Sequence, residues 1–290
     1  MARSKTIWGP YESCPSNPLL RAVDTDNYIQ HTGHGDLVQD SQDRWWAVCL
    51  AVRKDENGRY AMGRETFLTP VEWQAEWPVF EPVRRDPSKL ASHHHVIWLY
   101  SSPSVDLVYI RDALMENYHY SRDGSDFKVT ASPVDLFDSE VSPTFIGKRQ
   151  RLLQGRSSVT VTGISKDWEP TRVKCGLAYY KDEHRYFRVF FQASDRSIVF
   201  EQKNDAQEIS KTWQQFLDEI PATISFAFEY TEKEFRLMYC LGNGSAQSWN
   251  TIAVVDTLTM TDPDFVGPVF GIFAVADESV EVVFDKFEHQ

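Results

Sequence analysis

The sequence has no long hydrophobic run. Its longest apolar stretches, such as 187–191 and 270–276, are far shorter than the roughly 20 residues that a membrane-spanning helix needs. Residues 1–10 contain no apolar segment of the kind that a secretory signal requires. The four cysteines are widely separated and form no C-x-x-C pair, which excludes a zinc ribbon and a dithiol redox motif. We therefore expect a cytoplasmic protein with free thiols and no membrane partner.

Basic residues are in deficit. The chain has 30 Lys and Arg against 42 Asp and Glu, a formal net charge of −12, which argues against nucleic acid as the main partner. No P-loop, dinucleotide fingerprint or G-x-S-x-G elbow is present, so we expect no cofactor. The 290 residues are 42% hydrophobic and 13% aromatic, a globular composition long enough for two domains of unequal size.

The remaining signal is mostly that of β-strands. In residues 223–230, Ile224, Phe226, Phe228 and Tyr230 share one face, which predicts a half-buried antiparallel strand that turns at 231–233 into the next. About ten such segments recur at the spacing of a β-sandwich. They include 157–162, 173–180, 185–192, 197–202, 234–240 and 279–287. Only the segment from Ile209 to Ile220, with Trp213, Phe216 and Leu217 at helical spacing, predicts a helix.

The first 85 residues differ from the rest of the chain. They hold five of the nine tryptophans, in short apolar runs interrupted by Gly and Pro, and a polar connector begins at Asp86. We place a domain boundary near residue 90. The predicted fold is all-β, with a first domain over 1–90 and a sandwich with its connector over 91–290.

An ordered series of motifs resembles a known family. Residues 9–12 read GPYE, 17–20 NPLL, 32–38 TGHGDLV and 63–68 GRETFL. Their order and spacing resemble the last part of the five-bladed propeller of family 43 glycoside hydrolases, the two-domain β-xylosidases and arabinofuranosidases. Residues 145–150, 175–180 and 267–274 resemble the concanavalin A-like sandwich that these proteins append. The resemblance implies a partial propeller packed on that sandwich.

The resemblance also implies what is missing. A family propeller has about 300 residues in four-stranded blades, whereas the matched segment supplies about a blade and a half. The family's three catalytic carboxylates lie upstream of the matched segment. Because inverting hydrolysis needs an acid and a base on opposite sides of the bond, we expect no glycosidase activity unless the true chain start lies upstream.

By resemblance, two residues line the family's active site. The histidine of the TGHGDLV motif is His34, which in the family points down the propeller axis, and the arginine of GRETF is Arg64, which lies close to the carboxylates. Both could instead be retained for structural hydrogen bonds. We expect no metal at His34, and none at the histidine tract 93–95, which lacks further ligands at zinc spacing. The segment 123–126 predicts a hairpin turn rather than an ion-binding loop.

These features predict an aromatic small-molecule pocket between the propeller fragment and the sandwich. The predicted catalytic residues are Arg64 and His34. The predicted substrate-binding residues are Trp8, Tyr28, Gln30, Trp46 and Phe67. A pocket without an acid–base pair suits a reaction driven by substrate folding and one hydrogen-bond donor. We therefore predict a cofactor-independent cyclase or isomerase, of the pericyclic, Diels–Alderase-like kind, acting on an apolar specialised metabolite.

Two other functions remain open from the sequence. The sandwich could bind glycans, with Trp168 or Trp249 as a stacking platform. Alternatively, the open strand edges of an incomplete propeller could pair two copies in a homodimer that acts as a scaffold.

Overall fold

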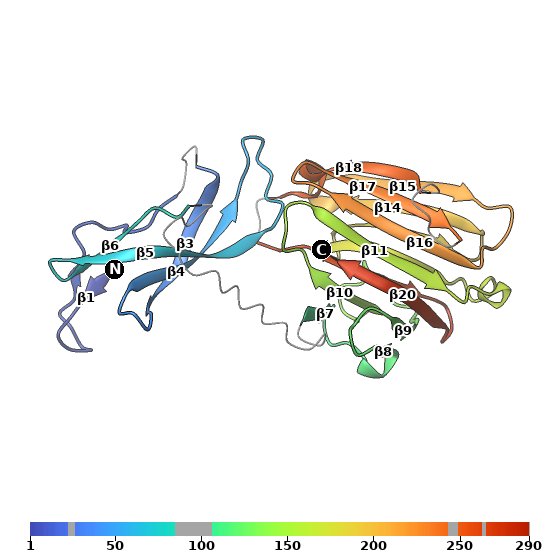
Figure 1. Ribbon diagram of the computed structural model, residues 1–290, viewed down its shortest axis with the longest axis horizontal. Helices are drawn as coiled ribbons and strands as arrows, with labels where there is room; N and C mark the ends of the chain where they lie inside the picture. The colour runs from blue at the N-terminus through green and yellow to red at the C-terminus, as the bar shows by residue number, and fades with distance from the viewer. Residues whose placement is uncertain (23–26, 85–105, 243–248, 263–264, 290) are drawn as a thin grey trace. The chain divides into compact units, whose positions relative to one another are not determined.

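The computed structural model describes residues 1–22, 27–84, 106–242, 249–262 and 265–289, all drawn in colour in Figure 1. The chain divides into two compact units. Unit 1 comprises Met1–Ile97 with Pro263–Phe265, and unit 2 comprises Trp98–Asp262 with Val266–Gln290. The division between residues 97 and 98 falls outside the described ranges, as do the histidine tract and the boundary predicted near residue 90. Described residues form strands and short 3-10 helices, so the prediction of an all-β chain is confirmed.

Unit 1 contains one four-stranded antiparallel sheet, whose strands follow each other in chain order as in a propeller blade. A two-stranded pair precedes it, so the unit has the strand content of about a blade and a half. The pair is β1 (Ala2–Arg3) with β2 (Glu12–Ser13). The four-stranded sheet, here called the blade sheet, is β3 (Ile29–Gln39), β4 (Trp45–Arg53), β5 (Arg64–Gln74) and β6 (Trp77–Phe80).

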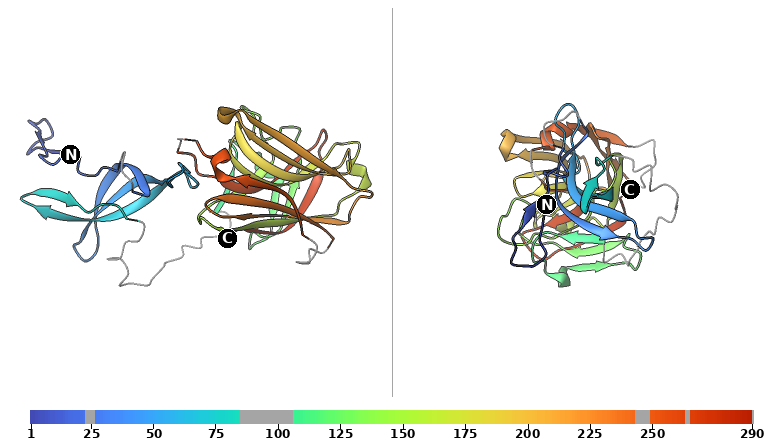
Figure 2. Two further views of the ribbon diagram at one scale, coloured as in Figure 1. Left: turned by 90° about the horizontal axis from the view of Figure 1, so that it is seen from above. Right: turned by 90° about the vertical axis from the view of Figure 1, so that its left-hand side faces the viewer.

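Unit 2 is a sandwich of two seven-stranded sheets that lie face to face (Figure 2). The first sheet has the order β15 (Ile209–Phe216), β14 (Ser197–Asn204), β13 (Arg185–Gln192), β12 (Lys174–Asp182), β19 (Val269–Val275), β10 (Phe145–Arg149), β7 (Leu107–Tyr109). The second has the order β18 (Asn250–Asp256), β17 (Glu234–Leu241), β16 (Thr223–Tyr230), β11 (Gly155–Thr162), β20 (Glu281–His289), β9 (Phe127–Thr130), β8 (Tyr118–Tyr120). Four 3-10 turns join strands: η1 (Met115–Asn117), η2 (Lys166–Trp168), η3 (Asp205–Gln207) and η4 (Thr257–Met260).

The central strands β12, β13 and β19 of the first sheet are buried on both faces, which explains their near-continuous apolar sequences. Along β12, Leu177 and Tyr179 belong to the main core between the sheets. Their neighbours Ala178 and Tyr180 belong to a second buried cluster, on the other face of the same sheet, which Leu136 helps to form. The outer face of the second sheet carries smaller and more polar side chains. On β16 these are Ser225 and Ala227, which are buried, and Glu229, which is exposed.

The seven sandwich segments predicted as strands are strands in the structure, and the turn at 231–233 joins β16 to β17. The prediction of a helix over 209–220 is wrong. Residues 209–216 form the edge strand β15, in register with β14 over eight residue pairs. Apolar residues at spacings of three and four also occur on an edge strand with little buried surface, and Trp213 and Phe216 are 45% and 69% exposed. The estimate of about ten strands was low because β7, β8 and β10 are only three to five residues long.

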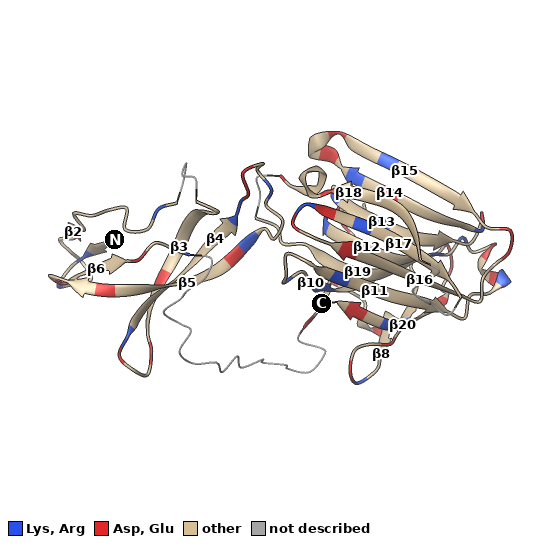
Figure 3. Cartoon of the chain, turned by 45° about the horizontal axis from the view of Figure 1, so that its top comes forward, with Lys and Arg blue, Asp and Glu red and all other residues tan. Residues whose placement is uncertain are grey.

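The predicted turn at 123–126 is confirmed, since it joins β8 to β9 as a hairpin. The Asp123 carboxylate accepts hydrogen bonds from the Ser121 and Ser125 hydroxyl groups at 2.6 and 2.9 Å. These bonds lower the pKa of Asp123. Acidic and basic side chains are interspersed over both units (Figure 3). All four cysteines are buried free thiols, as predicted.

Candidate functional site

One end of the blade sheet carries the arginine that the sequence singles out. The strand register places Gln30 of β3, Val52 of β4 and Arg64 of β5 side by side in one row across the sheet. Because directly paired residues point to the same face, Gln30 and Arg64 flank Val52 on one side. Val52 is buried, whereas Arg64, the first residue of its strand, is exposed.

Arg64 meets an aromatic ring that comes from far along the chain. The Arg64 amide donates a hydrogen bond of 3.3 Å to the Phe265 carbonyl oxygen. The Arg64 guanidinium lies 4.8 Å from the centre of the Phe265 ring, a cation–π geometry. Phe265 belongs to unit 1 although it follows η4 in the chain, and it is 58% exposed. An exposed cation with several donors and an exposed aromatic face therefore stand together.

Sequence reasoning missed Phe265. It lies in a loop between η4 and β19, where no hydrophobic periodicity ties a residue to a partner. The only available signal was that Phe265 follows the turn-forming sequence TDPD at 261–264 and is a large apolar residue in a polar loop.

The predicted substrate-binding aromatic residues do not gather around Arg64. Trp46 lies six positions from Val52 along β4, roughly 20 Å away at the rise of a strand. It is 6% exposed, and its indole nitrogen donates a 3.0 Å hydrogen bond to Asp40. Phe67 points to the opposite face of the blade sheet from Arg64, because the two are an odd number of positions apart on β5. Trp8 is 92% exposed in the turn between β1 and β2.

The remaining predicted residues are on or beside β3. Tyr28 is half-buried, and its carbonyl oxygen accepts a 2.8 Å hydrogen bond from the Lys54 amide. Gln30 is 5% exposed, and its side-chain amide donates to the Asn27 carbonyl oxygen at 2.5 Å. His34 is exposed and has a φ of +50°, at a point where the pairing of β3 with β4 shifts register. His34 is therefore four positions further along β3 than Gln30, outside the row that contains Gln30 and Arg64.

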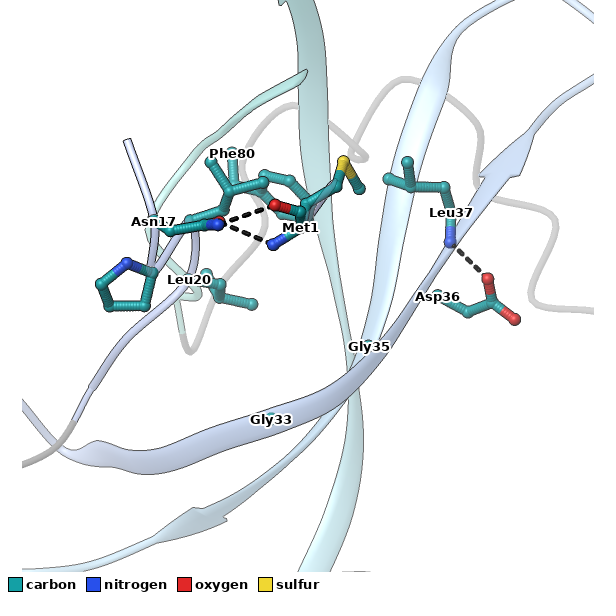
Figure 4. Close-up of a pocket in the computed structure, with 10 residues that line it drawn as sticks. Met1, Asn17, Leu20, Gly33, Gly35, Asp36, Leu37 and Phe80 are labelled. Atoms are coloured by element: carbon teal, nitrogen blue, oxygen red, sulfur yellow. Dashed lines mark hydrogen bonds between the residues drawn. The ribbon is translucent and has the colours of Figure 1, made fainter. Parts of the chain in front are cut away.

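A pocket of about 640 Å³ lies in unit 1 next to His34 (Figure 4). Gly33 and Gly35, the neighbours of His34, line it, and Asp36 is the carboxylate in its lining. The other lining residues are mostly apolar: Met1, Asn17, Pro18, Leu19, Leu20, Leu37 and Phe80. Asn17 joins two parts of this wall, since it accepts from the Met1 nitrogen at 2.6 Å and donates to the Met1 carbonyl oxygen at 2.7 Å. The pocket volume suits a small molecule.

The carboxylates near these features are held in fixed pairs. Glu65 forms a bidentate ion pair with Arg53, and both N–O distances are 2.6 Å. This pair lies on the face of the blade sheet opposite Arg64. The hydrogen bond from Trp46 is the main cause that holds the pKa of Asp40 far below its usual range. Within the described ranges, no three His, Cys, Asp or Glu side chains are grouped so that they could hold a metal ion.

The two tryptophans proposed as a glycan platform on the sandwich differ in exposure. Trp168 is 6% exposed and belongs to the main core, so it offers no open ring face. Trp249 is half-buried, and the Arg156 guanidinium lies 4.9 Å from its ring centre. Arg156 is itself paired with Glu229 at 3.0 Å.

Comparison with known protein families matches both units. Residues 1–78 match the model of glycosyl hydrolases family 43, and residues 101–290 match the β-xylosidase C-terminal concanavalin A-like domain. The chain belongs to the family of proteins that carry this concanavalin A-like domain, and its first unit is a fragment of the family 43 hydrolase fold. No helix of the described residues is long and apolar enough to cross a membrane.

Individual relatives agree with this assignment. A non-reducing end α-L-arabinofuranosidase of Bacteroides ovatus is 28% identical over 93% of this chain and 52% of its own length. A xylosidase/arabinosidase of Butyrivibrio fibrisolvens is 42% identical over 28% of this chain and 16% of its own length. The solved GH43 protein BlXynB of Bacillus licheniformis has the same fold over 98% of this chain and 57% of its own, with a TM-score of 0.80 and 22% identity. The chain thus spans about half the length of the B. ovatus enzyme.

Proposed function

We propose that this chain is a saccharide-recognising part of a family 43 glycoside hydrolase, with a site for terminal arabinosyl or xylosyl residues at Arg64 and Phe265. The observation that carries the proposal is the exposed guanidinium of Arg64 held against the exposed ring of Phe265. A sugar ring has an apolar face for an aromatic ring and hydroxyl groups for a fork of donors. The relatives, an α-L-arabinofuranosidase and a xylosidase/arabinosidase, suggest the class of sugar.

We assign recognition rather than proton transfer to this site. Glycoside hydrolysis uses two carboxylic groups on either side of the scissile bond. The carboxylate next to Arg64 in sequence, Glu65, points to the opposite face of the blade sheet and is engaged by Arg53. Hydrolysis would then depend on carboxylates other than Glu65, while Arg64 contributes binding energy and orientation.

The test is binding of arabino- and xylo-oligosaccharides to the 290-residue chain by isothermal titration calorimetry. Arg64→Ala and Phe265→Ala should each weaken binding by about tenfold, the size expected when a hydrogen-bond donor or an aromatic anchor that contacts the ligand is truncated. Arg44→Ala is the matched control, because Arg44 also stacks on an aromatic ring, that of Trp46 at 5.3 Å, away from the site. Equal affinity for all four proteins would refute the proposal. An assay with 4-nitrophenyl α-L-arabinofuranoside and β-D-xyloside, run beside it, measures any hydrolysis.

A second candidate function is a cofactor-independent cyclase or isomerase, and the pocket of Figure 4 is the observation that favours it. A mostly apolar pocket of about 640 Å³ can hold a flexible apolar substrate in a folded conformation, which lowers the barrier of an intramolecular cyclisation. Asp36 and the nearby His34 would supply the polar contacts.

Metabolite profiling tests this candidate. Cells that lack the gene should accumulate an uncyclised isomer with the mass of the missing product, and a Leu37→Trp variant that fills the pocket should not restore the product. Unchanged metabolites in those cells would exclude a cyclase.

A further inference from the structure

The turn between β1 and β2 holds a tryptophan in open solvent. Trp8 is 92% exposed, the largest exposure among the large hydrophobic side chains described, and its neighbour Ile7 is 78% exposed. Ile7 and Trp8 together form a small exposed apolar surface, and an exposed indole ring offers a flat face on which a ligand can stack. Trp8 is well removed in sequence from the strands that carry Arg64.

Hydrogen bonds across the turn fix its shape. The Gly9 amide donates to the Thr6 carbonyl oxygen at 3.1 Å, and the Thr6 hydroxyl donates to the Gly9 carbonyl oxygen at 2.9 Å. The Tyr11 hydroxyl donates to the Ile7 carbonyl oxygen at 2.8 Å. Gly9 has a φ of +85°, which favours glycine, and a Cβ at this position would lie 3.2 Å from the Tyr11 ring. The backbone on both sides of Trp8 is therefore pre-organised.

A pocket of about 680 Å³ lies beside this turn. Its lining is mostly apolar in surface, but it includes two cations, two carboxylates and two hydroxyl groups: Arg3, Lys5, Glu12, Glu76, Ser4 and Thr6. The formal charges cancel, since the two cations balance the two carboxylates. A charge-balanced lining that combines apolar surface with donors and acceptors fits a sugar ring, which has an apolar face and a rim of hydroxyl groups.

The polar groups of this lining are partly paired with one another. Arg3 pairs with Glu12 at 3.0 Å and with Glu76 at 3.3 Å, and its guanidinium lies 4.1 Å from the centre of the Trp77 ring. The guanidinium therefore lies among β2, the β5–β6 turn and an aromatic face. Glu12 and Glu76 are 61% and 88% exposed, so their carboxylates remain accessible to the hydroxyl groups of a ligand.

We propose that Trp8 and this pocket form a second saccharide site, which binds an internal stretch of a neutral oligosaccharide chain. Trp8 stacks on the apolar face of one sugar ring, and the side chains from Arg3 to Glu12 accept and donate hydrogen bonds to the hydroxyl groups of the next. The ligand class rests on the proposed function, while the site itself rests on the turn and its pocket. A site of this kind would hold a polymer while Arg64 and Phe265 hold its terminal residue.

The test compares long and short ligands on the complete 290-residue chain. The probes are soluble arabinoxylan in affinity electrophoresis and xylobiose in calorimetry. Trp8→Ala should weaken retention by arabinoxylan about tenfold and leave xylobiose affinity unchanged. Trp213→Ala is the matched control, because Trp213 is also an exposed tryptophan, at 45%, but lies on β15 of unit 2. Removal of an exposed side chain leaves the fold intact, which circular dichroism verifies.

A second variant tests the role of the turn. Thr6→Val keeps Trp8 but removes the hydroxyl group that donates to the Gly9 carbonyl oxygen, so the turn that supports Trp8 becomes less rigid. Retention by arabinoxylan should therefore fall, but by less than in Trp8→Ala, and the temperature dependence of binding should change. Retention of Trp8→Ala equal to that of the unsubstituted chain would overturn the second site. If Arg64→Ala loses xylobiose affinity at the same time, the proposed function survives that result. Loss of arabinoxylan retention in Trp8→Ala, with no effect of Arg64→Ala, would support the second site and contradict the first.

Discussion

We expect the stability of the sandwich to depend strongly on Arg188. Its side chain is 2% exposed, on β13, the third strand of the first sheet. It forms an ion pair with Asp135, and its Nε donates to Glu201 at 2.7 Å. Its guanidinium lies 4.9 Å from the Phe190 ring and 5.0 Å from the Phe273 ring. We expect Arg188→Met to keep most of this packing and to lose the charge.

The expected loss follows from what the substitution leaves behind. Asp135 is 7% exposed, and burial alone would raise its pKa. Arg188 outweighs that effect and, with Lys174 at 3.8 Å, holds the pKa of Asp135 below its usual value. Without Arg188 the buried carboxylate keeps the Leu136 amide, which donates to it at 2.7 Å, but its one remaining charged partner is the distant Lys174. Such a loss of the close partner of a buried charge typically costs about 3–5 kcal/mol. For a unit of this size that corresponds to a fall in Tm of roughly 6–20 °C.

Differential scanning calorimetry of the complete chain measures this fall. Arg156→Met is the matched control, because Arg156 pairs with Glu229 on the other sheet with both side chains more than 40% exposed, and such pairs contribute about 1 kcal/mol or less. The double variant Arg188→Met, Asp135→Asn should recover much of the loss, because it removes the unpaired charge. A Tm for Arg188→Met that matches that of the control would refute this reasoning.

Three further predictions concern single positions. Burial lowers the pKa of His289 to about 4, so between pH 6.5 and 4 only the unfolded chain takes up the proton. The free energy of unfolding measured with urea should therefore fall by up to about 3 kcal/mol over this range, and His289→Phe should remove this dependence. Gly176→Ala should lower the urea midpoint by the equivalent of about 1–3 kcal/mol or more, because the added Cβ would lie 2.2 Å from the Val189 carbonyl oxygen. Asp40→Leu, which removes the acceptor, should change the fluorescence of Trp46, whose indole nitrogen donates to that carboxylate, and an unchanged emission spectrum would contradict the hydrogen bond.

The sandwich was predictable because each of its strands carries its own signal. Alternation over eight residues in 223–230 sets both the strand and the face that Phe226 and Phe228 bury. The edge strand β15 was not predictable from that signal, because only one neighbour and little burial constrain its side chains. Its strand form depends on backbone pairing with β14, which periodicity does not reveal.

The candidate site was predictable only in part. The motif around Arg64 identified the residue and the family, and the register of the blade sheet explains its exposure beside Gln30. The aromatic partners were a harder inference, since a tryptophan in a strand gives no indication of which face it joins. Trp46 is buried and donates a hydrogen bond to Asp40, whereas Phe265 contacts Arg64 from a loop in the other half of the chain. Contacts between residues far apart in sequence depend on the path of the whole backbone.

If the proposed saccharide sites are correct, unit 2 provides most of the stability and unit 1 the recognition. Both clusters of buried hydrophobic residues found among the described residues lie in unit 2, where charged side chains such as Arg188 are turned inward and paired. In unit 1, by contrast, Arg64, Phe265 and Trp8 keep their polar or aromatic groups exposed on short, hydrogen-bonded supports. Substitutions in unit 2 should therefore change the unfolding temperature and leave oligosaccharide affinity intact, while those three in unit 1 should do the reverse. A variant of Arg64 that lowered Tm as much as Arg188→Met would show that the guanidinium on Phe265 is a structural contact, and the saccharide site would have to be sought elsewhere.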